Sequence, residues 1–452
     1  MKLGPAQIRK IYFLGIGGIG MSALARYFRS KGSAIYGYDK TPTALTDELI
    51  SEGMVIHFND DPSAIPPDVG LIVYTPAIPQ ELEEYKFLKA SGILMLKRSQ
   101  VTGCITEGKM TVAVAGTHGK TSISTLIAHI LKSSDFPVTA LIGGISKNYQ
   151  SNFISTGKED IMVLEADEYD RSFLYLHPDI AVISAIDPDH LDIYGTAGEM
   201  NRSFDEFAHN IKPGGKLVHR KGLQICPNPE TPMVSYAADE NSDVTAINLR
   251  TANGFQYFDL LVGGQYNRNI QLQVPGKHNV ENALAAVAVC TNIGVDMNRI
   301  LEGIRTFTGV RRRFDVRVQL PRRIYIDDYA HHPKELEAFI TAVRTLYPGR
   351  KITGLFQPHL YSRTKDFADG FAQSLDMLDE AWLLDIYPAR ELPLAGVTSQ
   401  LILDLMHQKN KKLVSRPEVL KMLKSLKPEV FLTMGAGDID LLVAPITEIL
   451  IS

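Results

Sequence analysis

The stretch that decides the fold is TVAVAGTHGKTS, residues 111–122. Its first five residues are short and apolar, which is typical of a strand buried in a parallel sheet. Gly116 and Gly119 then open a tight loop, and a helix-compatible run follows at 121–132. A strand, a glycine-containing loop that ends in Lys-Thr, and a helix together predict a phosphate-binding loop in an α/β domain.

The residue types in this loop suit a nucleoside triphosphate. Lys120 can reach the β- and γ-phosphates, and the hydroxyl of Thr121 can bind Mg²⁺. The longer pattern G-x-x-x-x-G-K-[ST] is not met, because Val114 stands at its first glycine. A lysine at an ordinary helix start is the alternative, but the strand-loop-helix context favours phosphate binding. The residues predicted to bind ATP here are Ala115, Gly116, Thr117, His118, Gly119, Lys120, Thr121 and Ser122.

A second glycine-rich turn, GIGGIG at residues 15–20, lies near the N-terminus between a predicted strand and a predicted helix. Glycines at this spacing let the backbone approach a pyrophosphate, and an acid at the end of the next strand can accept a hydrogen bond from a ribose hydroxyl. The motif alone fits both NAD and a UDP-sugar, which share these parts, and a crossover without a ligand is the other alternative. The residues predicted to bind the ligand are Gly15, Gly17, Gly18, Gly20 and Asp39.

Composition limits the class of protein. A chain of 452 residues, 45% of them hydrophobic, is too long for one core. The net charge of -4 and the lack of a basic block argue against nucleic-acid binding. The three scattered cysteines, the N-terminus without a signal-peptide pattern and the lack of a long apolar run predict a cytoplasmic protein that does not bind a membrane.

Short apolar runs alternate with amphipathic stretches, which predicts parallel sheets covered by helices. The predicted strands are 11–16, 34–38, 71–74, 111–115, 161–164, 180–186, 351–356, 381–386 and 430–434. The pattern predicts an α/β protein of three domains: a Rossmann-like domain at 1–107, a central P-loop ATPase-like domain at 108–313 and a C-terminal Rossmann-like domain at 314–452. The turn-rich segment 216–274 is predicted to be a β-rich addition to the central domain.

Further motifs follow the phosphate-binding loop in a fixed order. They are EADE at 165–168, DPDHLD at 187–192, PGKHNVEN at 275–282, RRRFD at 311–315, DDYAHHP at 327–333, FQPHLYSRT at 356–364 and DIYPARE at 385–391. With the AGTHGKTS loop, this series resembles the Mur ligase family over nearly the whole chain.

The resemblance implies an ADP-forming ligase that activates a carboxylate as an acyl phosphate, which an amine then attacks. The start GIGGIGMS and the segments DDYAHHP, FQPH and DIYPARE favour a member that joins L-alanine to UDP-N-acetylmuramate. A ligase that attaches a murein tripeptide to the same sugar is the nearest alternative. The implied cofactors are ATP and Mg²⁺, and the implied assembly is a monomer or a homodimer.

The resemblance also implies roles for single residues. The metal ligands are Thr121, Glu165 and His190, and the catalytic residues are Lys120, Glu165, His190, Arg312 and Arg313. ATP is also bound by His278, Asn279 and Asn282, which precede a predicted helix at 283–290, and by Asp328 at the ribose. His359 and Arg363 bind the incoming amino acid, whose carboxylate suits a guanidinium. Helix capping is the alternative role for His278, and a solvated linker is the alternative for the arginines.

Two other classes of function explain only part of the pattern. A nicotinamide oxidoreductase would use the first glycine-rich turn but would leave Lys120 and Glu165 without a role. A non-enzymatic nucleotide switch would use the phosphate-binding loop but not the first domain. A ligase that holds a nucleotide-linked substrate in one domain and ATP in the next accounts for both glycine-rich turns.

Overall fold

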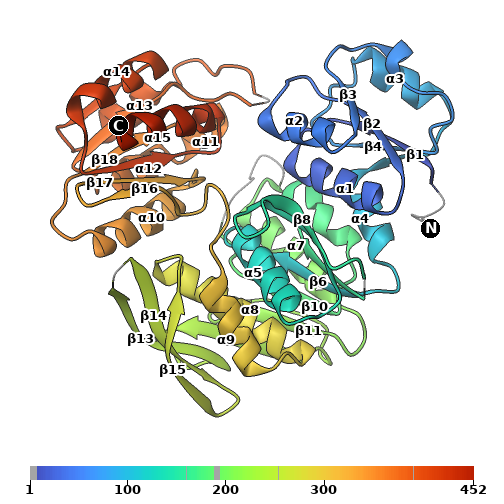
Figure 1. The fold of residues 1–452 in the computed structure, drawn as a ribbon, viewed down its shortest axis with the longest axis horizontal. Coiled ribbons are helices and arrows are strands. Elements are labelled where there is room, and N and C mark those ends of the chain that lie inside the picture. The colour runs from blue at the N-terminus through green and yellow to red at the C-terminus, as the bar shows by residue number, and fades with distance from the viewer. Residues whose placement is uncertain (1–7, 159, 188–193, 253, 390) are drawn as a thin grey trace. The chain divides into compact units, whose positions relative to one another are not determined.

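The computed structural model describes residues 8–158, 160–187, 194–252, 254–389 and 391–452 (Figure 1). These described residues form three sheets, and the chain divides into two compact units. One unit comprises Met1–Ile247, Asp259–Arg268 and Glu281–Phe307, and the other comprises Asn248–Phe258, Asn269–Val280 and Thr308–Ser452. The predicted α/β fold with three sheet-based domains is confirmed.

The first sheet has five parallel strands in the order β3-β2-β1-β4-β5. Its strands are β1 (Lys10–Leu14), β2 (Ala34–Tyr38), β3 (Val55–His57), β4 (Leu71–Tyr74) and β5 (Met95–Lys97), and its helices are α1 (Ile19–Ser30), α2 (Ala44–Ser51), α3 (Glu83–Ala90) and α4 (Arg98–Thr106). The strand order reverses between β1 and β4, and ligands of open α/β sheets bind at such a switch point. The turn at 15–20 follows β1 and therefore lies there.

The second sheet has ten strands in the order β15-β14-β13-β12-β11-β10-β6-β9-β7-β8. Its strands are β6 (Met110–Ala115), β7 (Val138–Ser146), β8 (Ser151–Ser155), β9 (Ile161–Glu165), β10 (Ile180–Ile183), β11 (Lys216–Arg220), β12 (Met233–Ala238), β13 (Val244–Ala252), β14 (Phe255–Val262) and β15 (Gln265–Leu272). Its helices are α5 (Lys120–Ser133), α7 (Ala197–His209), α8 (Lys277–Ile293) and α9 (Met297–Thr306), with the short helix η3 (Tyr169–Tyr175). Parallel pairing of β6 with β9 and β10 brings the carboxyl ends of these three strands together.

The third sheet has six strands in the order β16-β17-β21-β18-β19-β20. Its strands are β16 (Asp315–Leu320), β17 (Arg323–Asp328), β18 (Ile352–Phe356), β19 (Glu380–Leu383), β20 (Lys411–Leu413) and β21 (Val430–Met434). Its helices are α10 (Pro333–Leu346), α11 (Tyr361–Asp366), α12 (Ala368–Leu375), α13 (Ser399–Leu405), α14 (Arg416–Leu426) and α15 (Val443–Ile451). Only the edge pair β16–β17 is antiparallel among these strands. No described helix combines the length and apolar character needed to cross a membrane.

The first two sheets share one hydrophobic core. Phe28 of α1, Ile105 of α4 and Phe173 of η3 are fully or almost fully buried in a single cluster that also includes residues of β6, β9 and β10. The ring of Tyr27 meets the ring of Phe153 in β8 edge-on, at 6.5 Å between centroids. Packing therefore continues across the predicted boundary near residue 107, and the first sheet lies in one compact unit with strands β6 to β12 of the second.

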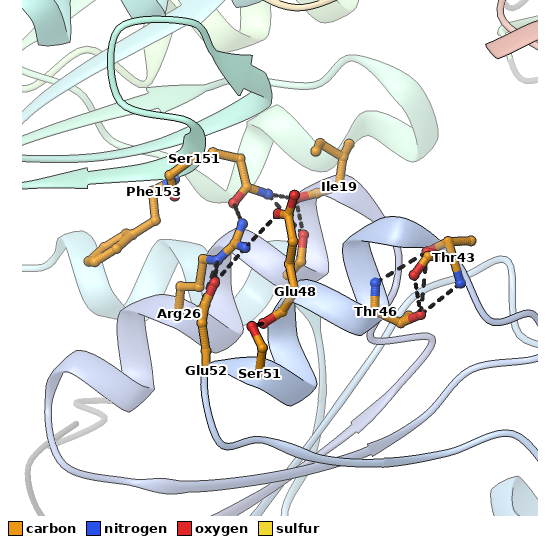
Figure 2. A network of polar contacts seen from close by, with 11 residues as sticks. Ile19, Arg26, Thr43, Thr46, Glu48, Ser51, Glu52, Ser151 and Phe153 are labelled. Atoms are coloured by element: carbon orange, nitrogen blue, oxygen red, sulfur yellow. Dashed lines mark hydrogen bonds and ion pairs between the residues drawn. The ribbon is translucent and has the colours of Figure 1, made fainter. Parts of the chain in front are cut away.

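A partly buried polar network adds to this packing (Figure 2). Arg26 of α1, of which only 6% is exposed, donates to Glu52 at 2.6 Å and to Glu48 at 3.2 Å. Its remaining nitrogen donates to the Asn152 side-chain oxygen at 2.5 Å. The Asn152 amide in turn donates to the backbone oxygen of Ile19 at 2.7 Å. The network ties β8 to the first turn of α1, directly after the glycine-rich turn.

We expect Arg26→Met to lower the free energy of unfolding by about 1–3 kcal/mol, because it leaves the buried oxygen of Asn152 without a donor and removes charge-assisted bonds to two carboxylates. Urea denaturation measures the loss. Arg29→Met, an exposed arginine on the same helix, is the matched control and should cost much less. Equal losses in the two variants would show that the network does not stabilise the fold.

Candidate active site

The loop between β6 and α5 has a backbone that only glycine adopts without strain. Gly116 has a φ of 126° and Gly119 a φ of 85°, both in the region that favours glycine. A Cβ on Gly116 would lie 2.8 Å from the backbone nitrogen of Ala185. The N-cap of α5 makes no side-chain hydrogen bond, so the first amides of the helix have no capping side chain. A helix start without a side-chain cap on its N-cap residue, behind a glycine loop, can offer backbone N–H donors to a phosphate group.

Lys120 is held at this loop by a buried ion pair. Its Nζ donates to the backbone oxygen of Gly116 at 2.8 Å and to both carboxylate oxygens of Glu168 at 2.8 Å each. The Glu168 side chain is 2% exposed. Burial lowers the pKa of Lys120, but the neighbouring carboxylates, Glu168 first, raise it more, and the net shift is upward. The lysine therefore stays protonated beside the loop.

Glu165 ends β9 and pairs in register with Val114 of β6, just before the loop. One of its carboxylate oxygens accepts the N–H of Gly143 in β7 at 2.6 Å and faces the hydroxyl of Ser124 in α5 at 3.5 Å. A Cβ on Gly143 would lie 2.5 Å from the other oxygen. Two neighbouring elements therefore fix the position of the carboxylate, and a side chain on Gly143 would displace it.

The predicted magnesium ligands are only partly described by the structure. Thr121 is buried in the first turn of α5, and Glu165 ends a strand adjacent to β6, whereas His190 lies outside the described residues. Within the described ranges, no three His, Cys, Asp or Glu side chains form a metal-binding group. Mg²⁺ usually takes one or two carboxylates and fills its other positions with water and phosphate oxygens, so Glu165 and the hydroxyl of Thr121 fit it.

The segment at 275–282 differs in one respect from the sequence prediction. Helix α8 begins at Lys277, directly after Gly276 with its φ of 111°, so His278, Asn279 and Asn282 lie within the helix and not before it. The Asn279 side chain donates to the backbone oxygen of Pro275 at 2.8 Å and thus helps to fix the helix start. Burial lowers the pKa of His278 to about 4, which keeps its ring neutral.

Asn282 is the residue of α8 that reaches the phosphate-binding loop. Its side-chain oxygen lies where a Cβ on Gly119 would be 2.6 Å away. One predicted ATP-binding residue of α8, Asn282, therefore meets the loop, and both lie within the first unit.

The glycine-rich turn of the first sheet is shaped by hydrogen bonds to its own surroundings. Gly15, with a φ of 82°, donates to the backbone oxygen of Tyr38 at 2.8 Å. Asp39 accepts the N–H of Gly17 at 2.8 Å and that of Thr41 at 3.2 Å. Gly18 is the N-cap of α1 and makes no side-chain cap. Asp39 thus fixes the turn, and its contact with a ribose stays a prediction.

Asp328, predicted to bind ATP, and Arg312 and Arg313, predicted to be catalytic, all lie in the second unit and form bonds within it. Asp328 accepts the N–H groups of Phe314 at 2.6 Å and Ala330 at 2.8 Å, and burial raises its pKa to about 6. Arg312 donates to Asp327 at 3.3 Å and to the backbone oxygen of Gly435 at 2.6 Å. The guanidinium of Arg313 lies 4.8 Å from the ring centre of Tyr329. These bonds organise the start of the domain, and the predicted ATP contacts stay predictions.

His359 and Arg363 follow β18, at the edge of the third sheet where its parallel strands end. The ring of His359 stacks on Tyr387, with 5.8 Å between centroids. Leu360 has a φ of 68°, which turns the chain sharply into α11. Arg363 lies on that helix and is buried. Open α/β sheets bind ligands at this edge, and the contact of His359 and Arg363 with an amino acid stays a prediction.

Comparison with known families covers nearly the whole chain. The model described as "Mur ligase family, catalytic domain" matches residues 10–110, "Mur ligase middle domain" matches 114–290, and "Mur ligase, glutamate ligase domain" matches 312–437. The chain belongs to the Mur ligase family. ATP use follows from this membership.

Individual Mur ligases match over their full length. The UDP-N-acetylmuramate–L-alanine ligase of Porphyromonas gingivalis is 48% identical, with 98% of this chain and 99% of the relative covered. The crystal structure of the UDP-N-acetylmuramate–alanine ligase of Thermotoga maritima is 28% identical, with a TM-score of 0.84 over 97% of this chain and 98% of that one. A murein peptide ligase from Psychrobacter arcticus has a TM-score of 0.72 at 22% identity, with 98% of both chains covered, and shares the fold.

The structure also brings residues to the Mur ligase site that the sequence analysis did not single out. Glu168 pairs with Lys120, and Asp167 lies between Glu165 and Glu168 within the EADE motif, which was the available signal. Arg98 pairs with Asp167 at 3.4 Å. Because Arg98 belongs to no recognised motif and lies far from Asp167 in the sequence, only the fold reveals it.

Proposed function

We propose that this Mur ligase joins L-alanine to the lactyl carboxylate of UDP-N-acetylmuramate through an acyl phosphate, with release of ADP, in peptidoglycan precursor synthesis. The observation that carries the proposal is the 48% identity, over nearly the full length of both chains, to a ligase named for that reaction. The two glycine-rich turns within one compact unit support it, because one suits a nucleotide-linked sugar and the other ATP.

The chemistry requires positive charge between the two turns. ATP supplies the phosphoryl group that activates the carboxylate, and Mg²⁺ offsets the negative charge of the phosphates. The carboxylates around Lys120 stabilise its protonated form, so Lys120 supplies a fixed positive charge to the phosphates. Glu165 and Thr121 supply oxygen ligands for the metal, and we propose His190, Arg312 and Arg313 as the other catalytic residues. Preorganised charges of this kind are typically the largest contribution to such catalysis.

ATP binding is further proposed for the remaining residues of the loop and of α8. Asn282 supports this proposal because it packs against Gly119 of the loop. Asp328 is proposed to bind the ATP ribose. Its two oxygens already accept backbone N–H groups, but an ionised carboxylate has about four acceptor positions and can accept another bond.

The amino acid is proposed to bind at the third sheet, with His359 nearby and its carboxylate on Arg363. An arginine stays protonated, so it fixes a carboxylate without competing as a nucleophile. The buried position of Arg363 strengthens such a bond, because water does not screen it.

We expect Arg363→Ala to raise the KM for L-alanine about ten- to hundredfold, the effect of losing one charge-assisted pair. The KM values for ATP and the UDP-sugar should change much less. Initial rates at varied alanine concentration test this. Lys365→Ala, an exposed cation on the same helix, is the control and should leave alanine use intact. Unchanged alanine kinetics in Arg363→Ala would exclude its role.

The proposed function is tested by ADP release from ATP and UDP-N-acetylmuramate with each amino acid in turn. L-alanine should give the largest kcat/KM, and a murein tripeptide should be a poor substrate. A tripeptide that outcompetes alanine would make the chain a recycling ligase, and ADP release independent of any amine would indicate a nucleotide switch. NADH binding without UDP-sugar binding would overturn the assignment of the first turn.

We propose three domains that each bind one ligand. Residues 1–107 bind the UDP-sugar, residues 108–313 bind ATP, and residues 314–452 bind the amino acid. We also propose that the protein is cytoplasmic and that it is a monomer or a homodimer. Sedimentation at several protein concentrations distinguishes the two assembly states.

A further inference from the structure

We infer that Arg98 binds the diphosphate of the nucleotide-sugar substrate at the glycine-rich turn of the first sheet. The inference rests on the proposed function, because it names a further residue for the substrate assigned there. Its basis is the position of the guanidinium between the start of α1 and the EADE segment.

The Arg98 side chain lies against the first turn of α1. A Cβ on Gly20 would be 3.1 Å from the Nη1 atom of Arg98 and 3.2 Å from its Cδ and Cζ atoms. Gly20 is the second residue of α1, whose N-cap makes no side-chain hydrogen bond and whose first turn has no acidic residue. The positive end of the helix and the guanidinium therefore lie together. The carboxylates that meet them come from other segments: Asp39 accepts the N–H of Gly17 at 2.8 Å, and Asp167 pairs with the guanidinium at 3.4 Å.

The fold explains why the guanidinium lies there. Arg98 is the first residue of α4 and directly follows β5, so it lies at the carboxyl end of the first sheet. The glycine-rich turn follows β1 at the same edge. The side chain of the preceding residue, Lys97, has a different partner, because its Nζ donates to Asp170 at 2.9 Å. The two adjacent cations thus have different surroundings, which makes Lys97 a matched control.

Arg98 has hydrogen-bonding capacity left for a ligand. Among the described residues, its one ion pair is with Asp167, at 3.4 Å, and the two side chains are 26% and 40% exposed. A guanidinium carries five N–H donors in a planar fork that matches a phosphate group. Arg26, in the same unit, has short bonds to Glu52 and Asn152 and is 6% exposed. Arg26 therefore has a structural role, whereas the guanidinium of Arg98 is accessible to an anion.

The same guanidinium reaches the segment that surrounds the phosphate-binding loop. Asp167 precedes Glu168, the partner of Lys120, and follows Glu165 by two residues. Arg98 therefore links the two anion sites of the unit. A diphosphate at the first turn is a stronger partner than one long contact to a half-exposed carboxylate, so Arg98 should bind the ligand in preference to Asp167.

Calorimetry on the full-length protein tests this with two probes, UDP and uridine. Arg98→Ala should weaken UDP binding about ten- to hundredfold, the loss expected for one charge-assisted pair, and should leave uridine and ATP binding within about twofold. Arg98→Lys should retain part of the UDP affinity. Lys97→Ala should leave it unchanged.

The outcomes separate the inference from the proposed function. Unchanged UDP affinity in Arg98→Ala, or an equal loss for UDP and uridine, would overturn the role of Arg98 while the proposed function stands. Wild-type protein that binds neither UDP nor UDP-N-acetylmuramate would overturn the proposed function itself. If Arg98→Ala fails to fold, Arg98→Gln replaces it, because glutamine keeps most of the side chain without its charge. The ratio of UDP affinity to uridine affinity is then measured for Arg98→Gln in the same way.

Discussion

Lys120→Ala should lower kcat for ligation about 10³-fold, the upper range for removal of one preorganised charge at a reacting group. The structure holds this ammonium at the phosphate-binding loop through the backbone of Gly116 and the carboxylate of Glu168. Lys120 is the one lysine or arginine among loop residues 115–122. Release of ADP in the presence of all three substrates measures the effect.

The design of this experiment must account for Glu168. Removing the lysine breaks its ion pair with the buried carboxylate of Glu168, and breaking a buried pair typically costs about 3–5 kcal/mol of stability. The double variant Lys120→Met with Glu168→Gln removes both charges and should unfold close to the wild type while it stays inactive. Lys132→Met, at the other end of α5, is the control for loss of a lysine. Ligation by the double variant at a near-normal rate would remove Lys120 from the catalytic residues.

Glu165→Gln should lower kcat about 10²-fold and raise the Mg²⁺ concentration needed for half-maximal rate. The amide oxygen of glutamine can still accept the N–H of Gly143, so the local fold should persist while the negative charge is lost. A Mg²⁺ titration of the rate distinguishes a metal ligand from a structural acid. An unchanged Mg²⁺ dependence would assign Glu165 a structural role.

A second variant displaces the carboxylate without removing it. A methyl group on Gly143 would lie 2.5 Å from one oxygen of Glu165, so Gly143→Ala should reproduce part of the loss in kcat and the same shift in Mg²⁺ dependence. Gly198→Ala is the control, because a Cβ there meets nothing closer than 3.8 Å. If Gly143→Ala matches the wild type, the exact position of the carboxylate is unimportant.

Local sequence signals predicted most of the sheet framework. The runs at 34–38, 71–74 and 430–434 became strands with the predicted bounds, because a buried parallel strand is a short apolar run with polar neighbours. The glycine loop before Lys120 likewise predicted the start of α5 to within a residue. The β-rich character expected for 216–274 is confirmed by strands β11–β15, which extend the central sheet.

Other features depend on contacts between distant segments. The start of α8 was placed too late because the polar residues after Gly276 resemble a loop, although their side chains suit the first turns of a helix. The pairing of Lys120 with Glu168 and the approach of Arg98 to Gly20 require knowledge of which strands are neighbours. Residue types and motifs therefore identified the chemistry of the site, but not the counter-ions that hold its charges in place.

The hydrogen bond between Arg26 and Asn152 has a consequence for hybrid enzymes that combine segments of two Mur ligases. A hybrid ligase that takes its first 107 residues from a relative would join a foreign α1 to a resident β8, so the donor and acceptor of that contact would come from different parents. Such hybrids should tolerate a junction after β8 better than one at residue 107.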